Sequence, residues 1–319
     1  MTDNSTAHCY FQPRRIAHVN YVVSDLNRLM DFYIEILGIE EVYRTPETSA
    51  GFVSNGNTHH DIGVVDISGD FAKSIDAQVG LYHFGYEIET EAALVEGYHR
   101  SVADHVQWVK TRTHDVAHSV YGMDPDGITF ELYADVTKDW RNRRKGTVTK
   151  KKPVWTPGCT PPITEPCYHV DPLLSRVEHA LFHPQRFKSA TLVATHSEAM
   201  IDTYTRIAGM RVLHGGADGE FCVLGGSLGE ANLYLFRARP GRPAGLHHVA
   251  LPVADIADLR ASIAKAPAVG IELEQVIDHP LRLSAYVCDP DGNRFQLYAD
   301  KQPVAAPLSA EPEAVLWIG

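Results

Sequence analysis

The chain has 319 residues, 44% of them hydrophobic and 22% charged, which excludes general disorder. This composition supplies apolar material for two cores of about 100–150 residues each. The formal net charge of −11 argues against nucleic acid as a partner, because phosphate binding requires a clustered positive surface. No apolar run approaches the roughly 18 residues of a membrane span and no apolar signal segment follows the first residues, so we expect a cytoplasmic protein without membrane contact.

The cysteines are five in number, widely scattered, and contain no C-x-x-C pair: Cys9, Cys159, Cys167, Cys222 and Cys288. This pattern indicates neither a disulfide framework nor a thiolate zinc site. We therefore expect free thiols.

The first predicted elements alternate in type. Ile16–Val23 has the alternating pattern of a strand, and the apolar residues of Leu26–Leu37 share one helical face, so we predict a helix that ends at Gly38. Short strands are expected around Gly51–Ser54 and Asp61–Asp66.

The same order then begins again. We predict a strand at Leu81–Ile88, a helix at Glu91–Val102, and strands on both sides of the turn Asp124–Gly127. The chain up to Asp135 therefore predicts two βαβββ units.

The second half of the chain repeats the first. SVYGMDPDGITFELYAD at 119–135 recurs as SAYVCDPDGNRFQLYAD at 284–300, and the offset is 284 − 119 = 165 residues. We therefore predict an α+β fold of four tandem βαβββ units in two domains. The expected organisation is an N-terminal arm (1–14), a first domain (15–135), an extended linker (136–187), a second domain (188–300) and a C-terminal tail (301–319).

A basic run interrupts the acidic composition at the start of the linker. We interpret it as a solvated linker and not as an anion site. The run consists of Arg141, Arg143, Arg144, Lys145, Lys150, Lys151 and Lys152.

The four tandem units, with DPDG turns that precede F-E/Q-L-Y strands, resemble the vicinal oxygen chelate superfamily. Within it, the chain resembles the two-domain extradiol ring-cleaving dioxygenases of the catechol 2,3-dioxygenase type, except over 136–187 and after 300. The resemblance implies cleavage of an aromatic vicinal diol by dioxygen at a mononuclear Fe(II) centre, with Mn(II) as an alternative. Catechol, a bicyclic diol, a substituted protocatechuate and an aminophenol all remain open as substrates, and we expect a homo-oligomer.

The resemblance also implies a metal site of two histidines and one carboxylate. This sequence has His18 in R-I-A-H-V-N-Y, His83 in G-L-Y-H-F-G-Y and Glu131 in T-F-E-L-Y. Two neutral imidazoles and one carboxylate occupy one face of an octahedral ion and leave the other positions open for a diol and dioxygen. Each residue alone is as well explained by packing, but all three occur at the positions that the family uses.

The second domain has lost this set. Its alignment places Ser189 opposite His18, keeps His248 and places Gln296 opposite Glu131, so we expect it to be free of metal. In the two-domain extradiol enzymes the C-terminal domain is usually the active one, and this chain departs from that order.

Three further residues are candidates for catalysis. His60, in N-T-H-H-D-I-G-V, resembles the family's active-site histidine and is our candidate acid/base. We expect His59 to point to the opposite face of the same strand, because successive side chains alternate. Tyr121 resembles the family's substrate-binding tyrosine, although Tyr286 in the second domain allows a packing role.

His114, in T-H-D-V-A-H-S-V-Y, resembles a loop histidine that faces the substrate in catechol-type enzymes. Asp115 replaces a glycine of that pattern and is expected to restrict the turn. His118 lies in the same stretch and is a weaker candidate.

Three other functions share the fold. A glyoxalase-like isomerase or lyase generally completes its metal site with a carboxylate from a second pair of units. A non-catalytic small-molecule-binding protein normally lacks the triad, and a hydroquinone-cleaving enzyme would take ligands from the C-terminal domain. The triad, His60, His114 and Tyr121 together favour the dioxygenase.

Overall fold

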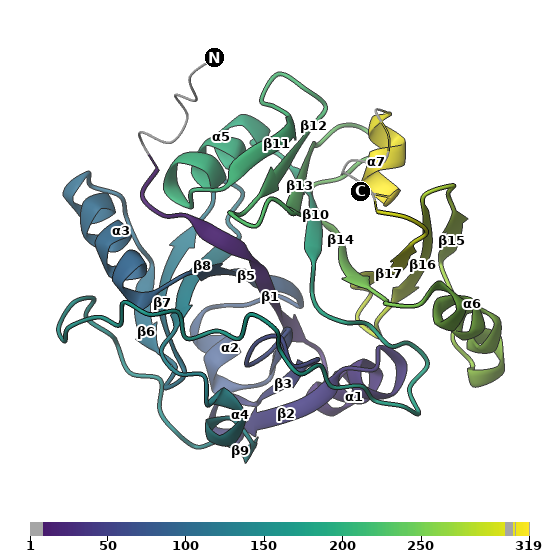
Figure 1. The fold of residues 1–319 in the computed structure, drawn as a ribbon, viewed down its shortest axis with the longest axis horizontal. Helices are drawn as coiled ribbons and strands as arrows, with labels where there is room; N and C mark the ends of the chain where they lie inside the picture. The colour runs from purple at the N-terminus through teal and green to yellow at the C-terminus, as the bar shows by residue number, and fades with distance from the viewer. Residues whose placement is uncertain (1–8, 304–308, 310, 319) are drawn as a thin grey trace.

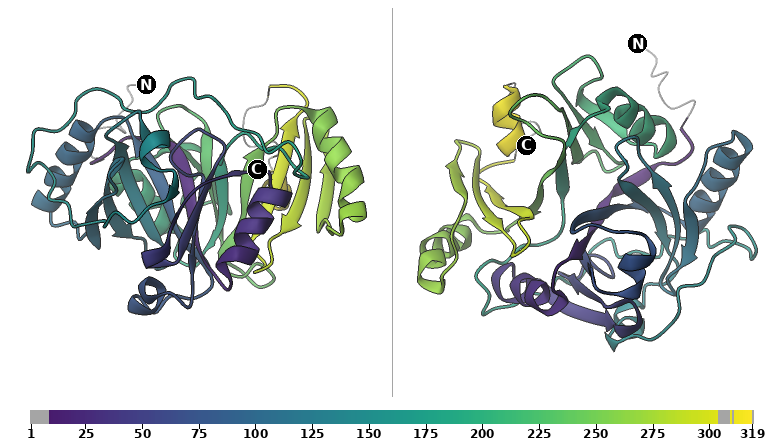
Figure 2. Two further views of the ribbon diagram at one scale, coloured as in Figure 1. Left: turned by 90° about the horizontal axis from the view of Figure 1, so that it is seen from below. Right: turned by 180° about the vertical axis from the view of Figure 1, so that it is seen from behind.

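The computed structural model describes residues 9–303, 309 and 311–318. Residues 1–8 of the expected N-terminal arm, and part of the expected tail, lie outside this description. Two mixed sheets of nine and eight strands form the body of the molecule, one from each half of the chain (Figures 1 and 2). The predicted α+β fold with two domains is therefore confirmed.

The first sheet has the order β6-β7-β8-β5-β1-β4-β3-β2-β9. The strand β1 pairs with β5 in antiparallel orientation and with β4 in parallel orientation, and β5 pairs with β8 in parallel orientation. Each βαβββ unit thus closes by pairing its first strand with its last, and the two units join through their first strands. The strands are β1 (Pro13–Val23), β2 (Glu40–Thr45), β3 (Ala50–Ser54), β4 (Ile62–Asp66), β5 (Gly80–Ile88), β6 (Lys110–Thr113), β7 (Ala117–Met123), β8 (Thr129–Asp135) and β9 (Gly146–Thr147).

The second sheet repeats this plan in the order β11-β12-β13-β10-β14-β17-β16-β15. Here β10 is antiparallel to β14 and parallel to β13, and β14 is parallel to β17. The two halves that repeat each other in sequence therefore also share the same pattern of strand pairing. The strands are β10 (Ser189–Ala194), β11 (Arg211–Gly215), β12 (Phe221–Gly225), β13 (Ala231–Arg237), β14 (Gly245–Pro252), β15 (Gln275–Asp278), β16 (Arg282–Cys288) and β17 (Arg294–Asp300).

The helices flank the sheets, and α3 and α6 lie at opposite ends of the molecule (Figures 1 and 2). The helix predicted at Leu26–Leu37 is divided into α1 and a π-helical turn, Phe32–Ile36, before Gly38. None of the helices in the described part of the chain is long and apolar enough to span a membrane. The α-helices are α1 (Leu26–Asp31), α2 (Asp70–Ser74), α3 (Glu91–Ala103), α4 (Trp140–Arg143), α5 (Ser197–Asp202), α6 (Ile256–Lys265) and α7 (Pro312–Ile318).

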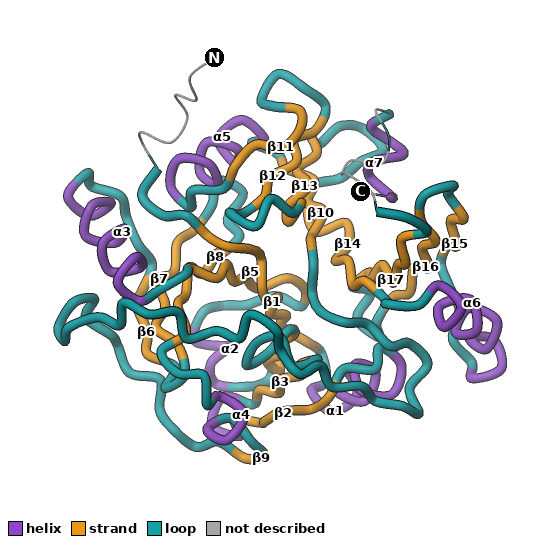
Figure 3. Tube along the Cα trace, in the orientation of Figure 1, coloured by secondary structure: helices purple, strands orange, loops and turns teal. Residues whose placement is uncertain are grey.

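The segment between β9 and β10 is almost entirely loop and crosses the face of the molecule (Figure 3). Its beginning is attached to the first sheet, because β9 pairs with β2 and the Thr111 hydroxyl donates a hydrogen bond to the Trp155 carbonyl. The linker therefore lies against the first domain near β2 and β6.

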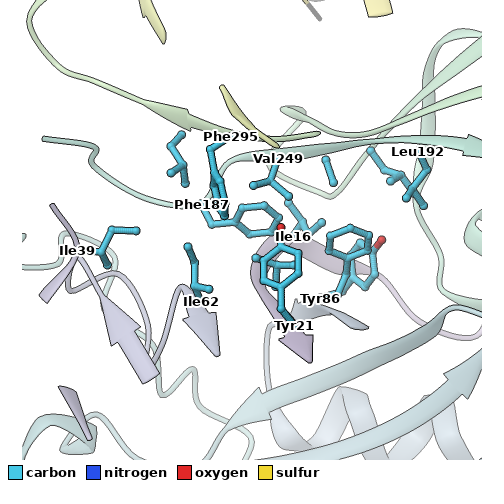
Figure 4. Packing of buried hydrophobic residues seen from close by; sticks show 14 of the residues in the cluster. Ile16, Tyr21, Ile39, Ile62, Tyr86, Phe187, Leu192, Val249 and Phe295 are labelled. Atoms are coloured by element: carbon cyan, nitrogen blue, oxygen red, sulfur yellow. The ribbon is translucent and has the colours of Figure 1, made fainter. Parts of the chain in front are cut away.

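One apolar core fills the space between the two sheets (Figure 4). Phe84 of β5 stacks on Phe187, with ring centroids 6.2 Å apart, and Tyr21 of β1 lies 6.1 Å from Phe295 of β17. Such continuous burial favours a fixed arrangement of the two domains over independent motion.

Two reciprocal hydrogen bonds accompany this core. The Tyr33 hydroxyl donates to Asp289, and the Tyr204 hydroxyl donates to Asp124, both at 2.9 Å. Each aspartate begins the DPDG turn of one domain, and each tyrosine belongs to a π-helical turn of the other domain, Phe32–Ile36 or Thr203–Ile207. Burial raises the pKa of Asp124 to about 6. The interface therefore depends on two buried carboxyl groups, each of which needs its donor.

We predict that Tyr204→Phe lowers the free energy of unfolding by about 1–3 kcal/mol, because it leaves a buried acceptor without its donor. The loss should be larger at pH about 8 than at pH about 4. A raised pKa means that the folded protein favours protonated Asp124, so its contribution to stability declines as the pH rises through about 6. The Tyr204 hydroxyl stabilises the ionised carboxylate of Asp124 more than its protonated form, so its removal costs more at the higher pH. Urea unfolding at both pH values measures the difference.

Tyr168→Phe is the control, since its hydroxyl binds Glu89 at the surface, at 3.2 Å. It should change stability by less than about 0.5 kcal/mol. Equal losses for the two variants would contradict the role of Tyr204.

Candidate metal centre

Three buried side chains from three adjacent strands converge on one point. The Nε2 atom of His18 lies 2.9 Å from Oε2 of Glu131, and the Nε2 atom of His83 lies 3.1 Å from the same oxygen. One possible ligand atom from each residue lies within 4.8 Å of the others. No second cluster of histidine, cysteine or acidic side chains with this spacing occurs in the described ranges. The structure thus brings together all three residues that we proposed as ligands.

The strand register explains this convergence. His18 on β1 is paired with Gly85 on β5, and Gly85 is paired with Glu131 on β8. A Cβ atom at Gly85 would lie 2.0 Å from Cε1 of His18, so the imidazole occupies the space that the glycine leaves. His83 precedes Gly85 by two residues and therefore lies on the same face of β5.

The donor set fits a divalent ion. Adjacent ligands of an octahedral ion with bonds of about 2.1 Å are about 3.0 Å apart. Burial lowers the pKa of His83 to about 4 and favours the neutral imidazole. Burial alone would raise the pKa of Glu131, but hydrogen bonds and charge from His18 and His83 hold it well below its ordinary value. Neutral imidazoles and an ionised carboxylate are the forms that bind metals.

The second domain has the same register without the ligands. Ser189 is paired with Ala250, and Ala250 with Gln296. The Gln296 amide donates to the Ser284 hydroxyl at 3.0 Å and to the Trp317 carbonyl at 3.2 Å. Its amide nitrogen is therefore occupied by hydrogen bonds within the protein, while Oε1 has no hydrogen-bond partner among the described residues.

The helix α7 covers this second site. The Trp317 ring lies 4.6 Å from the ring of His247 and 5.1 Å from that of Tyr286. Val315 and Leu316 are buried against β10, β12 and β13. The C-terminal helix α7 thus covers one face of the second sheet, and the equivalent face of the first sheet remains open.

On the first sheet that face holds a cavity of about 360 Å³. Its walls come from β1 to β8 and from the linker, and they include His83 and Glu131. His60 also lines it, with its ring 4.2 Å from that of His18, as expected. The expectation that His59 faces away is wrong, because His59 lines the cavity as well. Both histidines lie in the loop between β3, which ends at Ser54, and β4, which begins at Ile62. The alternation rule does not apply to the loop between them.

Tyr121 and His114 form a pair beside Glu131. The Nε2 atom of His114 lies 2.8 Å from the Tyr121 hydroxyl and 3.8 Å from Oε1 of Glu131. Asp115 adopts a φ of 67°, the left-handed conformation typical of glycine, so the replacement is accommodated. His118 has a different environment, since its ring stacks on Trp155 at 4.5 Å.

The sequence reasoning missed Asn20. Its amide nitrogen lies 2.7 Å from Nε2 of His83 and 3.4 Å from Nε2 of His60. A Cβ at Gly63, its partner on β4, would lie 1.6 Å from Oδ1 of Asn20. The spacing of two residues from His18 on one strand is the signal that identifies it.

The interpretation of the basic run as a solvated linker is wrong in part. Arg144 is buried, with 1% of its surface exposed, and Lys150, Lys151 and Lys152 line the cavity. Lys110 and Arg112 of β6 line it as well. The pattern of residues within the basic run could not predict that these side chains line the cavity, because the path of the linker is determined by contacts with strands far away in the sequence.

Paired βαβββ units around a buried group of two histidines and one carboxylate define the vicinal oxygen chelate class of proteins. The chain belongs to the Glyoxalase/Bleomycin resistance protein/Dioxygenase superfamily, whose family model matches residues 15–132 and 186–297.

Two curated relatives match part of the chain. It is 28% identical over 122 residues to biphenyl-2,3-diol 1,2-dioxygenase 3 of Rhodococcus globerulus, which covers 38% of this chain and 63% of the relative. It is 30% identical over 131 residues to metallothiol transferase FosB of Staphylococcus saprophyticus, which covers 39% of this chain and 79% of that relative. The match to the dioxygenase thus spans less than two thirds of its length.

Solved structures match over nearly the whole chain. A Mn(II)-bound glyoxalase from Novosphingobium aromaticivorans has a TM-score of 0.65 at 16% identity, over 92% of this chain and 84% of the other. The 2,3-dioxygenase LapB from Pseudomonas sp. KL28 has a TM-score of 0.64 at 16% identity, over 94% of this chain and 98% of the other. At this identity the similarity establishes the shared fold.

We predict that Gly85→Ala displaces the His18 imidazole and lowers the free energy of unfolding by about 1–3 kcal/mol, as overpacking does. Ala250→Gly at the equivalent position of the second domain is the matched control. It should cost about 1 kcal/mol or less, because only a methyl group and some chain rigidity are lost. Urea unfolding measures both. A Gly85→Ala protein as stable as the parent would show that β5 adjusts freely and that the glycine is not required.

Proposed function

We propose that this protein cleaves an aromatic vicinal diol in the extradiol position with dioxygen. In this proposal one Fe(II) ion, or Mn(II) in its place, is held by His18, His83 and Glu131 of the first domain. The observation that carries the proposal is the convergence of these three side chains beside a cavity that His60, His114 and Tyr121 also line. Membership of the superfamily and the partial similarity to a diol dioxygenase support it.

Such an ion would supply Lewis acidity that lowers the pKa of the diol hydroxyls, together with open positions for dioxygen. The protein supplies the rest of the chemistry. Tyr43 and Phe52, stacked with ring centroids 4.2 Å apart, form an apolar wall that suits a planar aromatic ring.

His60 is the proposed proton acceptor. Burial and the adjacent His18 lower its pKa well below the ordinary value, so the imidazole is neutral. Its Nδ1 atom has no hydrogen-bond partner among the residues described. A base near the diol is required because chelation releases a hydroxyl proton.

Tyr121 and His114 are the proposed donors on the other side of the site. Burial raises the pKa of Tyr121 well above the ordinary value, so the phenol keeps its proton and can donate a hydrogen bond. Its distance of 2.8 Å from Nε2 of His114 places two polar groups where substrate oxygen atoms are expected.

Oxygen uptake by the Fe(II)-reconstituted protein with a panel of aromatic diols tests the function. Ring-cleaved products should appear as new visible absorbance, with close to one metal ion per chain. Isomerase or lyase activity without oxygen consumption would overturn the proposal in favour of the glyoxalase-like alternative.

We predict that Glu131→Gln removes both metal and activity. The change creates the residue already present at Gln296, so packing is preserved while the ion loses its anionic ligand. His248→Ala in the second domain should leave metal content unchanged and cost about 0.5–3 kcal/mol of stability. Elemental analysis and oxygen uptake measure both variants. Loss of metal in His248→Ala alone would place the site across the domains.

We also predict that His60→Phe keeps the metal but slows turnover by about 10²–10⁴-fold, the usual effect of losing a positioned acid or base. His118→Phe is the control, because the His118 ring stacks on Trp155 outside the site. This substitution should leave turnover unchanged. Single-turnover kinetics across a range of pH makes the comparison. Unchanged rates in His60→Phe would remove His60 from the proposal.

A further inference from the structure

The cavity beside the metal centre has an excess of positive charge. Its walls carry five basic side chains and two carboxylates, Glu47 and Glu131, and Glu131 belongs to the metal group. Of the five, Lys150 is paired with Asp115 at 2.9 Å. The other four form no ion pair with any described carboxylate: Lys110, Arg112, Lys151 and Lys152.

Two of these cations lie close to the proposed diol site. The Lys110 ammonium lies 4.8 Å from the ring centroid of Tyr121 and donates to the Tyr82 hydroxyl at 3.0 Å. The Lys152 ammonium lies 5.0 Å from the ring centroid of Phe52, which in turn lies 5.0 Å from the ring of His60. One lysine thus stands on the Tyr121 side of the cavity and the other on the His60 side.

A buried guanidinium adds to this charge. Arg144 donates to the carbonyl of His114, while its Nε and one terminal nitrogen have no hydrogen-bond partner in the described part of the chain. Burial, followed by the charge of Arg144, lowers the pKa of Lys152 to about 8. Uncompensated cations in a sheltered cavity are unfavourable, and a bound anion relieves this cost.

The diol itself does not supply that anion. Its ionised hydroxyls would bind the divalent ion, whose charge Glu131 already offsets in part, so the lysines at the cavity wall require a second negative group on the substrate.

We propose that the substrate is an aromatic diol with a carboxylate substituent, which Lys152 and Lys110 bind at the wall of the cavity. This inference rests on the proposed diol cleavage for the identity of the ring. The anion site itself rests only on the basic side chains.

Activity is tested with 3,4-dihydroxyphenylacetate and 2,3-dihydroxybenzoate, each compared with its neutral methyl ester, on the Fe(II)-reconstituted full chain. At least one acid should exceed its ester in kcat/KM by about tenfold or more, the range for a paired charge in a sheltered site. Lys152→Met should raise KM for the acid while leaving the ester within about threefold. Lys145→Met, an exposed lysine of the same segment outside the cavity, is the control.

Binding is measured separately by calorimetry with phenylacetate and phenylacetamide, which cannot be cleaved. The acid should bind more tightly than the amide in the parent, and Lys152→Met should abolish the difference. If the acid is preferred but no diol is cleaved, the anion site stands and the proposed function fails. If diols are cleaved with equal kcat/KM for acids and esters, or Lys152→Met weakens both equally, the carboxylate proposal is overturned.

Discussion

The contact between the His18 imidazole and the backbone of Gly85 determines the geometry of the proposed centre. The central pairing of β1 with β5 places the two residues opposite each other, and the absence of a side chain at Gly85 lets the ring reach Glu131 on the next strand. His83, on the same face of β5, completes the group. Three adjacent strands of one sheet are therefore sufficient to assemble it, and no residue of the second domain is required.

The two domains have the same strand register, but the equivalent face of the sheet is open in the first domain and covered in the second. In the second domain Ala250 replaces the glycine and Gln296 replaces the glutamate, while α7 packs its Trp317 against the site. The first domain keeps the corresponding space open as a cavity of about 360 Å³. The shared apolar core and the reciprocal bonds from Tyr33 and Tyr204 hold the filled domain against the open one. The two domains are thus packed together through buried contacts.

The linker contacts the loop that carries His114. The backbone of Asp115 takes the left-handed conformation of a glycine, and its carboxylate pairs with Lys150. This contact, together with the donation from Arg144 to the carbonyl of His114, attaches the basic segment to the loop that carries a proposed catalytic histidine. The charge of the cavity and the position of His114 therefore depend on the same contacts.

The sequence by itself determined the duplication and the α+β fold of βαβββ units, because strand periodicity and repeated motifs are local signals. Its resemblance to the superfamily indicated His18, His83 and Glu131, which the structure brings together. Only the tertiary structure decided that His59 faces the cavity, that Asn20 contacts His83, and that Lys152 lines the wall. Loops have no fixed alternation of side chains, and the path of a linker is set by contacts with strands far away in the sequence. The same reason applies to α7, whose place over the second site depends on packing against β10, β12 and β13 and not on its own pattern.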